Sequence, residues 1–356
     1  MTSVALSRQE LEALLPFATE PQAKHIQTII EHGSLKAAER AGLPRRTLQR
    51  ALRLVQAAAA LGEKKVTSAV TLPEFPDDDI SVDEIRASMA KRFQKRQAYE
   101  KSKEWFPIKV NIKGPIGVTF WGDPHVDDDG CNWPLLNHHC DLHRGNKALF
   151  SVNIGDTINN WSDRLAKLYA KQNTSAKTAR KLATWFLQDS GIQWIVWLMG
   201  NHDLWTEFPD FLRASNVARI PMEDWQARFR LVFPGGREAK IWASHNFAGH
   251  SQHNTLHGPQ RAAHTKAEAD IYAAGHTHNW AIHQEESGSR DFIYWLIRSR
   301  GYKFIDDYAM NLGHFPQDEG ASITCIINPD ATSQSGFIQA FADMDAATDY
   351  LAFLRK

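Results

Sequence analysis

The chain has 356 residues, of which 43% are hydrophobic and 23% charged, and its 41 basic and 41 acidic side chains leave a net charge of zero. This composition is typical of a soluble globular protein with one large and one small domain, and it excludes a uniformly basic nucleic-acid-binding chain. No apolar run is long enough to span a membrane, residues 1–20 lack a signal-peptide core, and three cysteines form no disulfide framework in a chain this long. We therefore expect a reduced, cytoplasmic protein without a membrane partner.

Residues 1–61 are predicted to form a separate helical module. Apolar residues at helical spacing predict helices over 23–31, 35–41 and 44–59. The second and third of these, joined by a short turn that contains Gly42, resemble a helix-turn-helix. The third helix carries four arginines: Arg45, Arg46, Arg50 and Arg53. A local basic excess can neutralise phosphates, so we favour DNA binding over the alternative of a helical bundle used for docking or oligomerisation.

Residues 62–104 are predicted to connect this module to the rest of the chain. Residues 62–79 contain two prolines and three consecutive aspartates, which is typical of a linker. A charged helix follows to about Lys103, with a thin apolar stripe that consists of Ile85, Met89 and Phe93. We expect the stripe to pack on a domain surface. Its basic residues are Lys91, Arg92, Lys95 and Arg96, which we interpret as a solvated face rather than a nucleic-acid contact.

Five short apolar runs in residues 105–356 are each followed at once by a polar motif. The runs lie over residues 116–121, 148–154, 194–199, 239–243 and 269–274. The motifs are Gly122-Asp123-Pro124-His125, Gly155-Asp156, Gly200-Asn201-His202-Asp203, Ser244-His245-Asn246 and Gly275-His276-Thr277-His278. Such runs are typical of buried strands, and ligands of such sheets collect beyond the strand ends. We expect Asp, His and Asn side chains at one edge, a donor set for transition metals.

The spacing within two motifs predicts where their side chains point. Asp123 and His125 are two residues apart, and on an extended strand end both would point toward one ion. His276 and His278 repeat this spacing, so one imidazole could serve each ion. Gly155 would let the backbone turn sharply and bring Asp156 to the site. Thirteen of the 16 histidines lie between residues 125 and 283, which argues against chance placement.

The remaining elements predict the fold of residues 105–356. Runs over 292–297 and 321–327 are assigned to a second sheet, and residues 341–354 to a terminal helix. Strands that alternate with helices and then give way to strand-rich sequence predict an α/β domain of two packed mixed β-sheets with helices outside. A second cluster of possible ligands comprises Cys131, His138, His139, Cys140 and His143. Its spacing is not typical of zinc sites and it lies on a predicted helix, so we interpret it as structural.

The ordered set of five motifs, each after a strand, resembles the calcineurin-like metallophosphoesterases over residues 115–280. The resemblance implies the same two-sheet sandwich and two adjacent metal ions. One ion would be held by Asp123, His125, Asp156 and His278, and the other by Asp156, Asn201, His245 and His276. His202 would lie beside the leaving-group oxygen as proton donor or charge stabiliser, oriented by Asp203. The implied reaction is attack of a metal-bridging hydroxide on a phosphodiester.

Some positions in this assignment stay open. His250 could complete the second metal site in place of His245, which we prefer because a strand end is more rigid than a loop. His250 and His257 otherwise become candidates for phosphate contact or ordinary loop residues. Asn159 stands where many family members have an acidic residue, which puts the local hydrogen-bond network in doubt. The donors suit Mn²⁺, which we expect, and also Zn²⁺, iron or Ni²⁺.

The motifs indicate a phosphoester substrate without specifying it. A nuclease or DNA phosphodiesterase, delivered to nucleic acid by the N-terminal module, is the first interpretation. Four tryptophans beside the motifs could stack bases or be ordinary wall and core residues: Trp133, Trp161, Trp205 and Trp280. A phosphatase or cyclic-nucleotide phosphodiesterase acting on a small or protein substrate is the second. A DNA-binding regulator with a vestigial metal site ranks last, because all the expected ligands are present.

Overall fold

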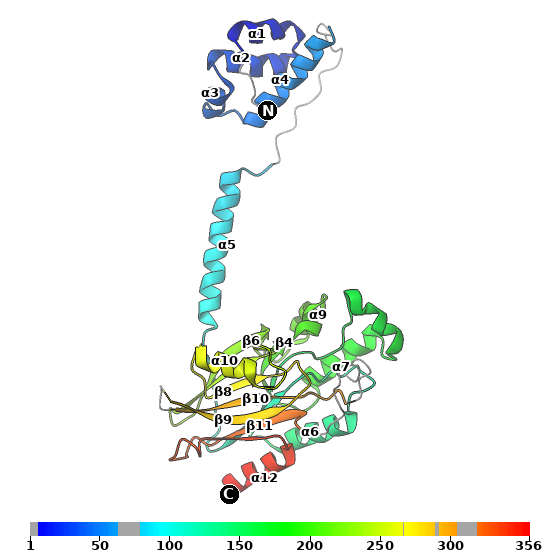
Figure 1. Cartoon of the computed structure of the whole chain (residues 1–356), viewed down its shortest axis with the longest axis vertical. Helices are drawn as coiled ribbons and strands as arrows, with labels where there is room; N and C mark the ends of the chain where they lie inside the picture. The colour runs from blue at the N-terminus through cyan, green and yellow to red at the C-terminus, as the bar shows by residue number, and fades with distance from the viewer. Residues whose placement is uncertain (1–5, 63–78, 266, 289–291, 305–318) are drawn as a thin grey trace. The chain divides into compact units, whose positions relative to one another are not determined.

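The chain divides into two compact units, Met1–Val82 and Asp83–Lys356, in a computed structural model (Figure 1). The structure describes residues 6–62, 79–265, 267–288, 292–304 and 319–356. The predicted linker over 62–79 therefore lies almost entirely outside the described residues. Each unit has its own hydrophobic core, and the two are described separately.

The first unit is a small helical domain. Its elements are α1 (Arg8–Leu14), the 3-10 helix η1 (Leu15–Phe17), α2 (Glu20–Glu31), α3 (Leu35–Arg40) and α4 (Arg45–Ala60). The core is formed by Leu11, Ala18, Ile26, Ile29, Ala38, Leu48 and Val55. Leu48 and Val55 face this core, whereas Arg45, Arg46, Arg50 and Arg53 of the same helix, which we call the α4 arginines, are exposed. The three predicted helices are present, with ends that shift by a few residues at most.

Helix α5 (Val82–Ser102) differs from its prediction. The helix spans the predicted residues, but none of its residues is buried: Ile85 is 47%, Met89 56% and Phe93 66% exposed. The expectation that this apolar stripe packs on a domain surface is wrong for the described chain. Charged residues surround the stripe on nearly every side of the helix, so it is too narrow to form the broad apolar face that packing requires. None of the described helices has the length and apolarity of a membrane span.

The second unit is built on two six-stranded sheets. The strands are β1 (Phe106–Lys109), β2 (Ile116–Trp121), β3 (Leu149–Asn153), β4 (Trp194–Met199), β5 (Met222–Asp224), β6 (Gln226–Val232), β7 (Glu238–Ser244), β8 (Ile271–Ala274), β9 (Ala281–Ser287), β10 (Phe292–Arg298), β11 (Ser322–Ile327) and β12 (Ile338–Phe341). Their order is β12-β11-β2-β3-β4-β5 in one sheet and β1-β6-β7-β8-β10-β9 in the other. Both sheets contain parallel and antiparallel pairs. The predicted fold class is confirmed.

The assignment of the last strands to one second sheet is wrong. Strand β10 pairs in parallel with β8, whereas β11 pairs antiparallel with β2 in the other sheet. The five strands that precede the motifs are also divided, with β2, β3 and β4 in one sheet and β7 and β8 in the other. Apolar runs show that a strand is buried but not which distant strand it pairs with. The motifs therefore meet where the ends of both sheets come together.

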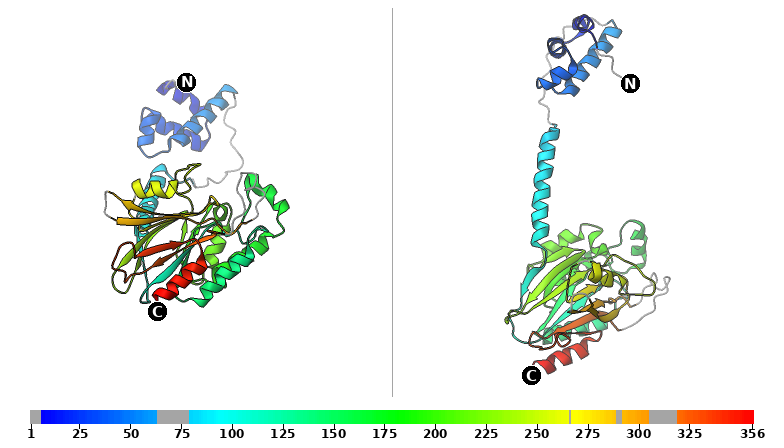
Figure 2. Two further views of the ribbon diagram at one scale, coloured as in Figure 1. Left: turned by 60° about the horizontal axis from the view of Figure 1, so that its bottom comes forward. Right: turned by 60° about the vertical axis from the view of Figure 1, so that its left-hand side comes forward.

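Helices cover the outer faces of the two sheets (Figure 2). Helices α6 (Trp133–Gly145) and α7 (Ala176–Gln188) pack against β2 and β4, and α12 (Met344–Leu354) packs against β2 and β11. Helix α10 (His257–Thr265) packs against β8 and β10 of the other sheet. The shorter helices η2 (Asp163–Lys171), α8 (Asn201–Leu204) and α9 (Phe208–Ser215) follow motif-bearing strands. Alternate residues of both sheets form the core between them.

The cysteine- and histidine-rich stretch is part of this packing. Cys131 and Cys140 are buried free thiols, and α6 carries His139 and His143 against the outer face of β2. The Nδ1 of His139 lies 2.7 Å from the hydroxyl of Tyr302, so the imidazole has a protein partner. Among the described residues, none of this stretch belongs to a cluster that could hold a metal.

Candidate metal centre

Two glycines let the motif-bearing strand ends approach one another. A Cβ on Gly155 would lie 2.4 Å from the Gly200 nitrogen and 2.9 Å from the His245 Nδ1 atom. A Cβ on Gly200 would lie 2.2 Å from the Asp156 Oδ1 atom. Such distances exclude any side chain at either position, so only glycine allows the ends of β3, β4 and β7 to meet here.

The ligand-bearing residues do not continue their strands. Asp123, His125, His276 and His278 have φ values of 44°, 41°, 73° and 51°, in the left-handed region that non-glycine residues seldom occupy. The prediction that Asp123 and His125 point toward one ion because they lie on an extended strand end is therefore wrong in its reason. The side chains nevertheless converge, because tight turns after β2 and β8 aim them. Rare backbone conformations of this kind gather at functional sites.

The predicted ligands meet in overlapping clusters. Asp123, Asp156, His245 and His276 form one, with one donor atom from each residue and all of these atoms within 4.8 Å of one another. The same criterion groups Asp123 with His125 and His278, and His125 with Asp156 and His202. The Asn201 Oδ1 atom lies 2.9 Å from the His245 Nε2 atom and so joins the first cluster. We call these residues, without His202, the metal centre. Asp123 is common to the first and second clusters, and Asp156, which the resemblance implies is shared, is common to the first and third.

Buried polar atoms in the metal centre fit a cation. Asp123 is fully buried and His125 is 1% exposed, yet the Asp123 Oδ1 and the His125 Nδ1 atoms have no hydrogen-bond partner. Buried polar atoms without partners are rare because they lose hydration without compensation. Carboxylate oxygens, imidazole nitrogens and an amide oxygen are the ligands that divalent transition metals accept. The residues present thus fit divalent cations on chemical grounds.

Electrostatics couple Asp156 to His245, whose side chains approach to 3.3 Å. Burial disfavours the charge on both, but their mutual attraction outweighs it, lowering the pKa of Asp156 and raising the pKa of His245. Burial lowers the pKa of His125 and His276, so these imidazoles are neutral. A metal ligand must offer a lone pair, so a cation binding here displaces the His245 proton.

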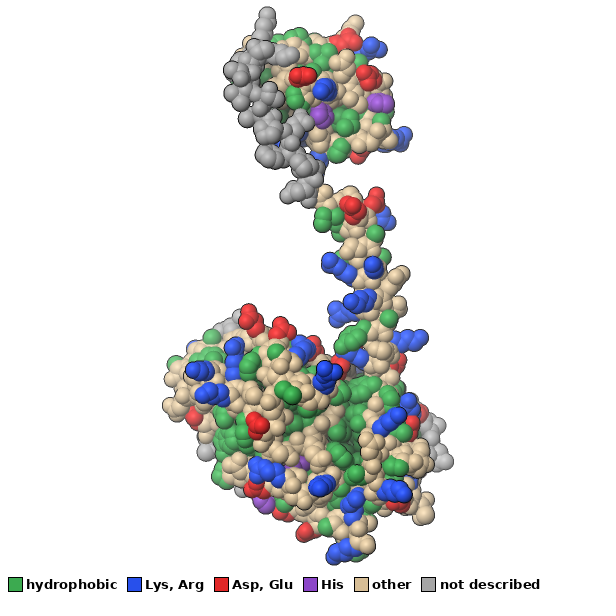
Figure 3. Space-filling model, turned by 180° about the vertical axis from the view of Figure 1, so that it is seen from behind, with side chains coloured by type: hydrophobic (Ala, Val, Ile, Leu, Met, Phe, Trp, Pro, Cys, Tyr) green, Lys and Arg blue, Asp and Glu red, His purple; other side chains and the backbone are tan. Residues whose placement is uncertain are grey.

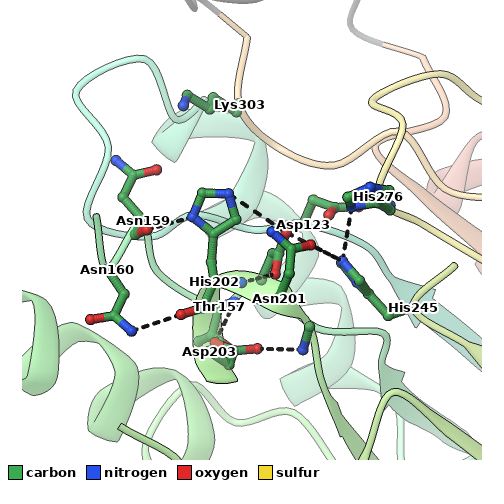
Figure 4. Close-up of polar contacts among 12 residues, drawn as sticks. Asp123, Thr157, Asn159, Asn160, Asn201, His202, Asp203, His245, His276 and Lys303 are labelled. Carbon is green, nitrogen blue, oxygen red and sulfur yellow. Dashed lines mark hydrogen bonds and ion pairs between the residues drawn. The ribbon is translucent and has the colours of Figure 1, made fainter. Parts of the chain in front are cut away.

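His202 presents one ring nitrogen to the metal centre (Figure 4). Its Nδ1 donates to the carbonyl of Asn159 at 2.5 Å, which leaves Nε2 facing inward, 3.9 Å from the Asp156 carboxylate. The rings of Trp161 and Trp205 lie 5.1 and 4.1 Å from the His202 ring, measured between centroids. The backbone carbonyl therefore fixes the tautomer and direction of an imidazole whose free nitrogen points at the ligands.

Asp203 has a different role from the one the resemblance implied. Its two carboxylate oxygens accept hydrogen bonds from the backbone nitrogens of Thr157 and Gly200, both at 3.0 Å (Figure 4). Asp203 is fully buried and joins the loops after β3 and β4. The carbonyl of Asn159, and not Asp203, orients His202. Asp203 thus acts on the site by holding two ligand-bearing loops together.

The contacts of Asn159 account for an amide side chain at this position, where the family pattern has an acidic residue. Its backbone nitrogen donates to Asp127 at 2.7 Å, and its side-chain amide donates to Asp128 at 2.6 Å. Lys303, only 6% exposed, pairs with the same Asp128 carboxylate at 3.0 Å and lies 5.0 Å from the Trp161 ring centre. The amide can donate where a carboxylate could not. Sequence patterns gave no signal for Lys303, because no motif surrounds it.

Other candidates lie away from the described clusters. His250 is exposed and His257 begins α10, and neither belongs to a described metal-capable cluster. Trp133 packs against Trp185 of α7 in a tilted arrangement, and Trp280 packs on the core between the sheets. Two of the four tryptophans therefore border His202 and two are structural.

No family model matches the chain, and no curated protein matches its sequence. Among solved structures, the chain is similar to the NAD nucleotidase NadN of Haemophilus influenzae, with 9% identity and a TM-score of 0.36, over 65% of this chain and 50% of that one. It is also similar to zinc-complexed Vps29 of Entamoeba histolytica, with 12% identity and a TM-score of 0.32, over 64% and 97%. The chain is also similar to GAP50 of Plasmodium, with 12% identity and a TM-score of 0.32, over 68% of this chain and 95% of that one. The alignment spans half of NadN. At these scores the likenesses carry no functional argument, and the metal centre rests on its own geometry.

Proposed function

We propose that this chain is a calcineurin-like, divalent-metal-dependent phosphoesterase that hydrolyses phosphodiester bonds in nucleic acid. The observation that carries the proposal is the buried convergence of Asp, His and Asn donors from five strand ends, with the Nε2 of His202 directed at them. Two divalent cations, for which we propose Mn²⁺, would polarise a phosphate and lower the pKa of a water at such a site.

The protein residues divide the work. Asp123, Asp156 and the imidazoles supply ligands, and Asn201 adds a neutral oxygen donor without adding charge. Because the neutral ring carries its proton on Nδ1, the Nε2 of His202 first takes up a proton from solvent, and the resulting imidazolium gives this proton to the leaving oxygen or stabilises its charge. Burial keeps bulk water from screening these charges.

Two further features support nucleic acid as the substrate. Trp161 and Trp205 border His202, so a phosphodiester in the centre would have aromatic surfaces beside it on which bases can stack. In the N-terminal unit, the α4 arginines are exposed on one helix, and we propose that this unit is a helix-turn-helix that binds duplex DNA.

Hydrolysis assays on the full chain test the proposal. Protein loaded with Mn²⁺ is expected to cleave bis-p-nitrophenyl phosphate and to nick plasmid DNA, and EDTA or Asp156→Asn should abolish both activities. Cleavage of the chromogenic diester but of no DNA or RNA would indicate a small or protein-borne substrate. Protein with bound metal that turns over no ester would instead be a regulator with a vestigial site.

A further inference from the structure

Trp225 connects the two sheets directly beside the metal centre. Its backbone nitrogen donates to the carbonyl of Met199 at 3.0 Å, at the end of β4, and its carbonyl accepts from the His245 nitrogen at 2.7 Å. Met199 precedes the Gly200-Asn201 motif, so one residue ties two ligand-bearing segments together. The Trp225 and His245 ring centres are 6.4 Å apart. Any feature at Trp225 is therefore next to the bound phosphodiester that we propose.

Both the conformation and the exposure of Trp225 are unusual. Its φ of 66° lies in the left-handed region, which is rare for a bulky residue, and its side chain is 49% exposed. A large aromatic ring that is half exposed to water adds little to the stability of the core and does not compensate for the strained backbone that holds it. Strain of this kind is kept where it serves a site. An exposed indole is a surface on which a flat apolar group can stack.

Trp225 lines a groove between β5, β6 and the C-terminal half of α5, with a volume of about 800 Å³. Acidic residues in the groove are largely neutralised, since ion pairs link Lys103 to Glu223, Arg213 to Asp224 and Arg228 to Glu104. The other charged residues that line the groove belong to none of these three pairs, and they determine the charge of the ligand that the groove attracts.

Three cations on α5 complete the groove, and we call them the α5 cations: Arg92, Lys95 and Arg96. Their spacing of three and four residues places them on one face of the helix. Among the residues that the structure describes, none forms an ion pair with them, and Glu100 is the one acidic lining residue outside the three pairs. Figure 3 shows Lys and Arg side chains spread along α5. The groove therefore carries a net positive charge, and its lining also includes the exposed Trp225.

We propose that this groove binds a single-stranded stretch of polynucleotide continuous with the phosphodiester in the metal centre. One base stacks on Trp225, and the following phosphates contact the α5 cations. The strand is single because stacking on an indole needs an open base face, and in a duplex the neighbouring stacked base pairs cover both faces of each base. This inference rests on the proposed function for the position of the scissile bond, and it adds a substrate-binding site that the metal centre alone does not imply.

Equilibrium binding tests the groove without requiring turnover. Fluorescein-labelled oligo-dT and oligo-U are titrated with full-length protein in EDTA, and anisotropy reports the dissociation constant. All proteins carry the α4 arginines as glutamine, which removes a contribution from the N-terminal unit. Replacing the α5 cations by glutamine should weaken binding at least about tenfold and reduce the slope of log K against log salt by about 2, near 0.7 per lost contact. A preference between the two oligonucleotides identifies DNA or RNA as the source of the strand.

The chain offers a matched control on α7. Lys177, Arg180 and Lys181 are exposed, have the same three-and-four spacing and lie outside the groove. Replacing these three by glutamine removes the same charge and should change the dissociation constant less than about twofold, as expected for distant exposed charges. If the α5 and α7 replacements weakened oligonucleotide binding equally, the attraction would be nonspecific, and the proposal that the groove is the binding site would be overturned.

Variants of Trp225 separate stacking from charge. Trp225→Ala should weaken binding by about tenfold, whereas Trp225→Phe, which keeps an aromatic face, should retain most of the affinity. Circular dichroism melts confirm that each variant is folded. Unchanged affinity in Trp225→Ala or in the α5 variant, or no binding by the parent, overturns the inference even if the protein hydrolyses diesters. If oligonucleotide binding depended on the groove but the protein hydrolysed no ester, the proposed function would be overturned, while the groove would remain a binding site for single strands.

Discussion

The imidazole of His245 lies 3.3 Å from the carboxylate of Asp156, and both side chains are almost completely buried. His250, the alternative candidate, is exposed beyond the end of β7. His245→Ala should therefore lose one of the two metal equivalents measured by mass spectrometry and lower kcat/KM at least about 100-fold, since even outer-shell changes cost up to that factor. His250→Ala should keep both metals. The reverse result would assign the second site to His250.

His202 should affect turnover more than metal content. Its Nδ1 is committed to the Asn159 carbonyl and its Nε2 faces the metal centre, whose seven proposed ligands do not include His202. His202→Ala should lower kcat by about 10²- to 10⁴-fold, the range of general acid–base catalysis, with the bound metal unchanged. Metal analysis beside steady-state kinetics on the chromogenic diester checks this. Undiminished turnover, or metal lost in proportion to activity, would contradict the role.

The approach of the strand ends should depend on Gly200. An added Cβ would lie 2.2 Å from the Asp156 carboxylate and 2.7 Å from the His245 ring. Gly200→Ala should displace Asp156, abolish stoichiometric metal binding and lower the free energy of unfolding by about 1–3 kcal/mol, as overpacking does. Gly235→Ala is the matched control, because no atom lies within 4 Å of its Cβ position. Titration with Mn²⁺ and urea unfolding compare the two, and similar behaviour would mean that the loops can separate freely.

The limits of sequence analysis follow from which contacts are local. Strand runs and the motifs after them depend on neighbouring residues, so β2 and β4 were predicted with the observed ends. The pairing of β10 with β8 depends on residues 20 or more positions apart and leaves no local pattern. Trp225 has no motif around it, and its importance comes from bonds to the ends of β4 and β7.

The turns that carry the ligands show the same limit. Alternation predicts direction only on extended backbone, and His125 has a φ of 41°. The backbone carbonyl of Asn159 orients His202, and no residue type could have indicated this because every residue has a carbonyl. Residue chemistry thus identified the donors, whereas the contacts that aim them are formed by backbone groups distant in sequence.

The N-terminal unit should bind duplex DNA in a salt-dependent manner. The α4 arginines are exposed, and the weak pair between Arg45 and Glu39, at 3.6 Å, leaves them available to phosphates. Replacing all four by glutamine should weaken duplex binding by the full-length protein more than tenfold and reduce the salt slope by up to about 3.6, near 0.9 per contact. Anisotropy titrations at several salt concentrations measure both quantities. Tight binding that ignores salt, or that survives the replacement, would assign the duplex site elsewhere.

Stability at acid pH should depend on His139, which is 6% exposed under α6. Burial lowers its pKa from the ordinary 6.5 to about 4. The unfolded chain therefore takes up a proton at this residue below pH 6.5 while the folded chain does not. The stabilisation is present in full above pH 6.5 and falls as the pH drops toward 4, by up to about 3 kcal/mol.

Urea unfolding at pH 7.5 and pH 5 in EDTA separates the contribution of His139 to the free energy of unfolding from that of metal binding. His139→Gln removes the titrating group, so its free energy of unfolding should fall less between the two pH values than that of the parent, because the unfolded variant has one fewer proton to bind. His253→Gln is the control, since His253 is exposed in the segment after β7 and lies away from α6. Its pH dependence should follow the parent. If His139→Gln showed the parent's full loss of stability, then His139 would already be protonated in the folded chain at pH 5, and its contact with Tyr302 would hold a charged ring.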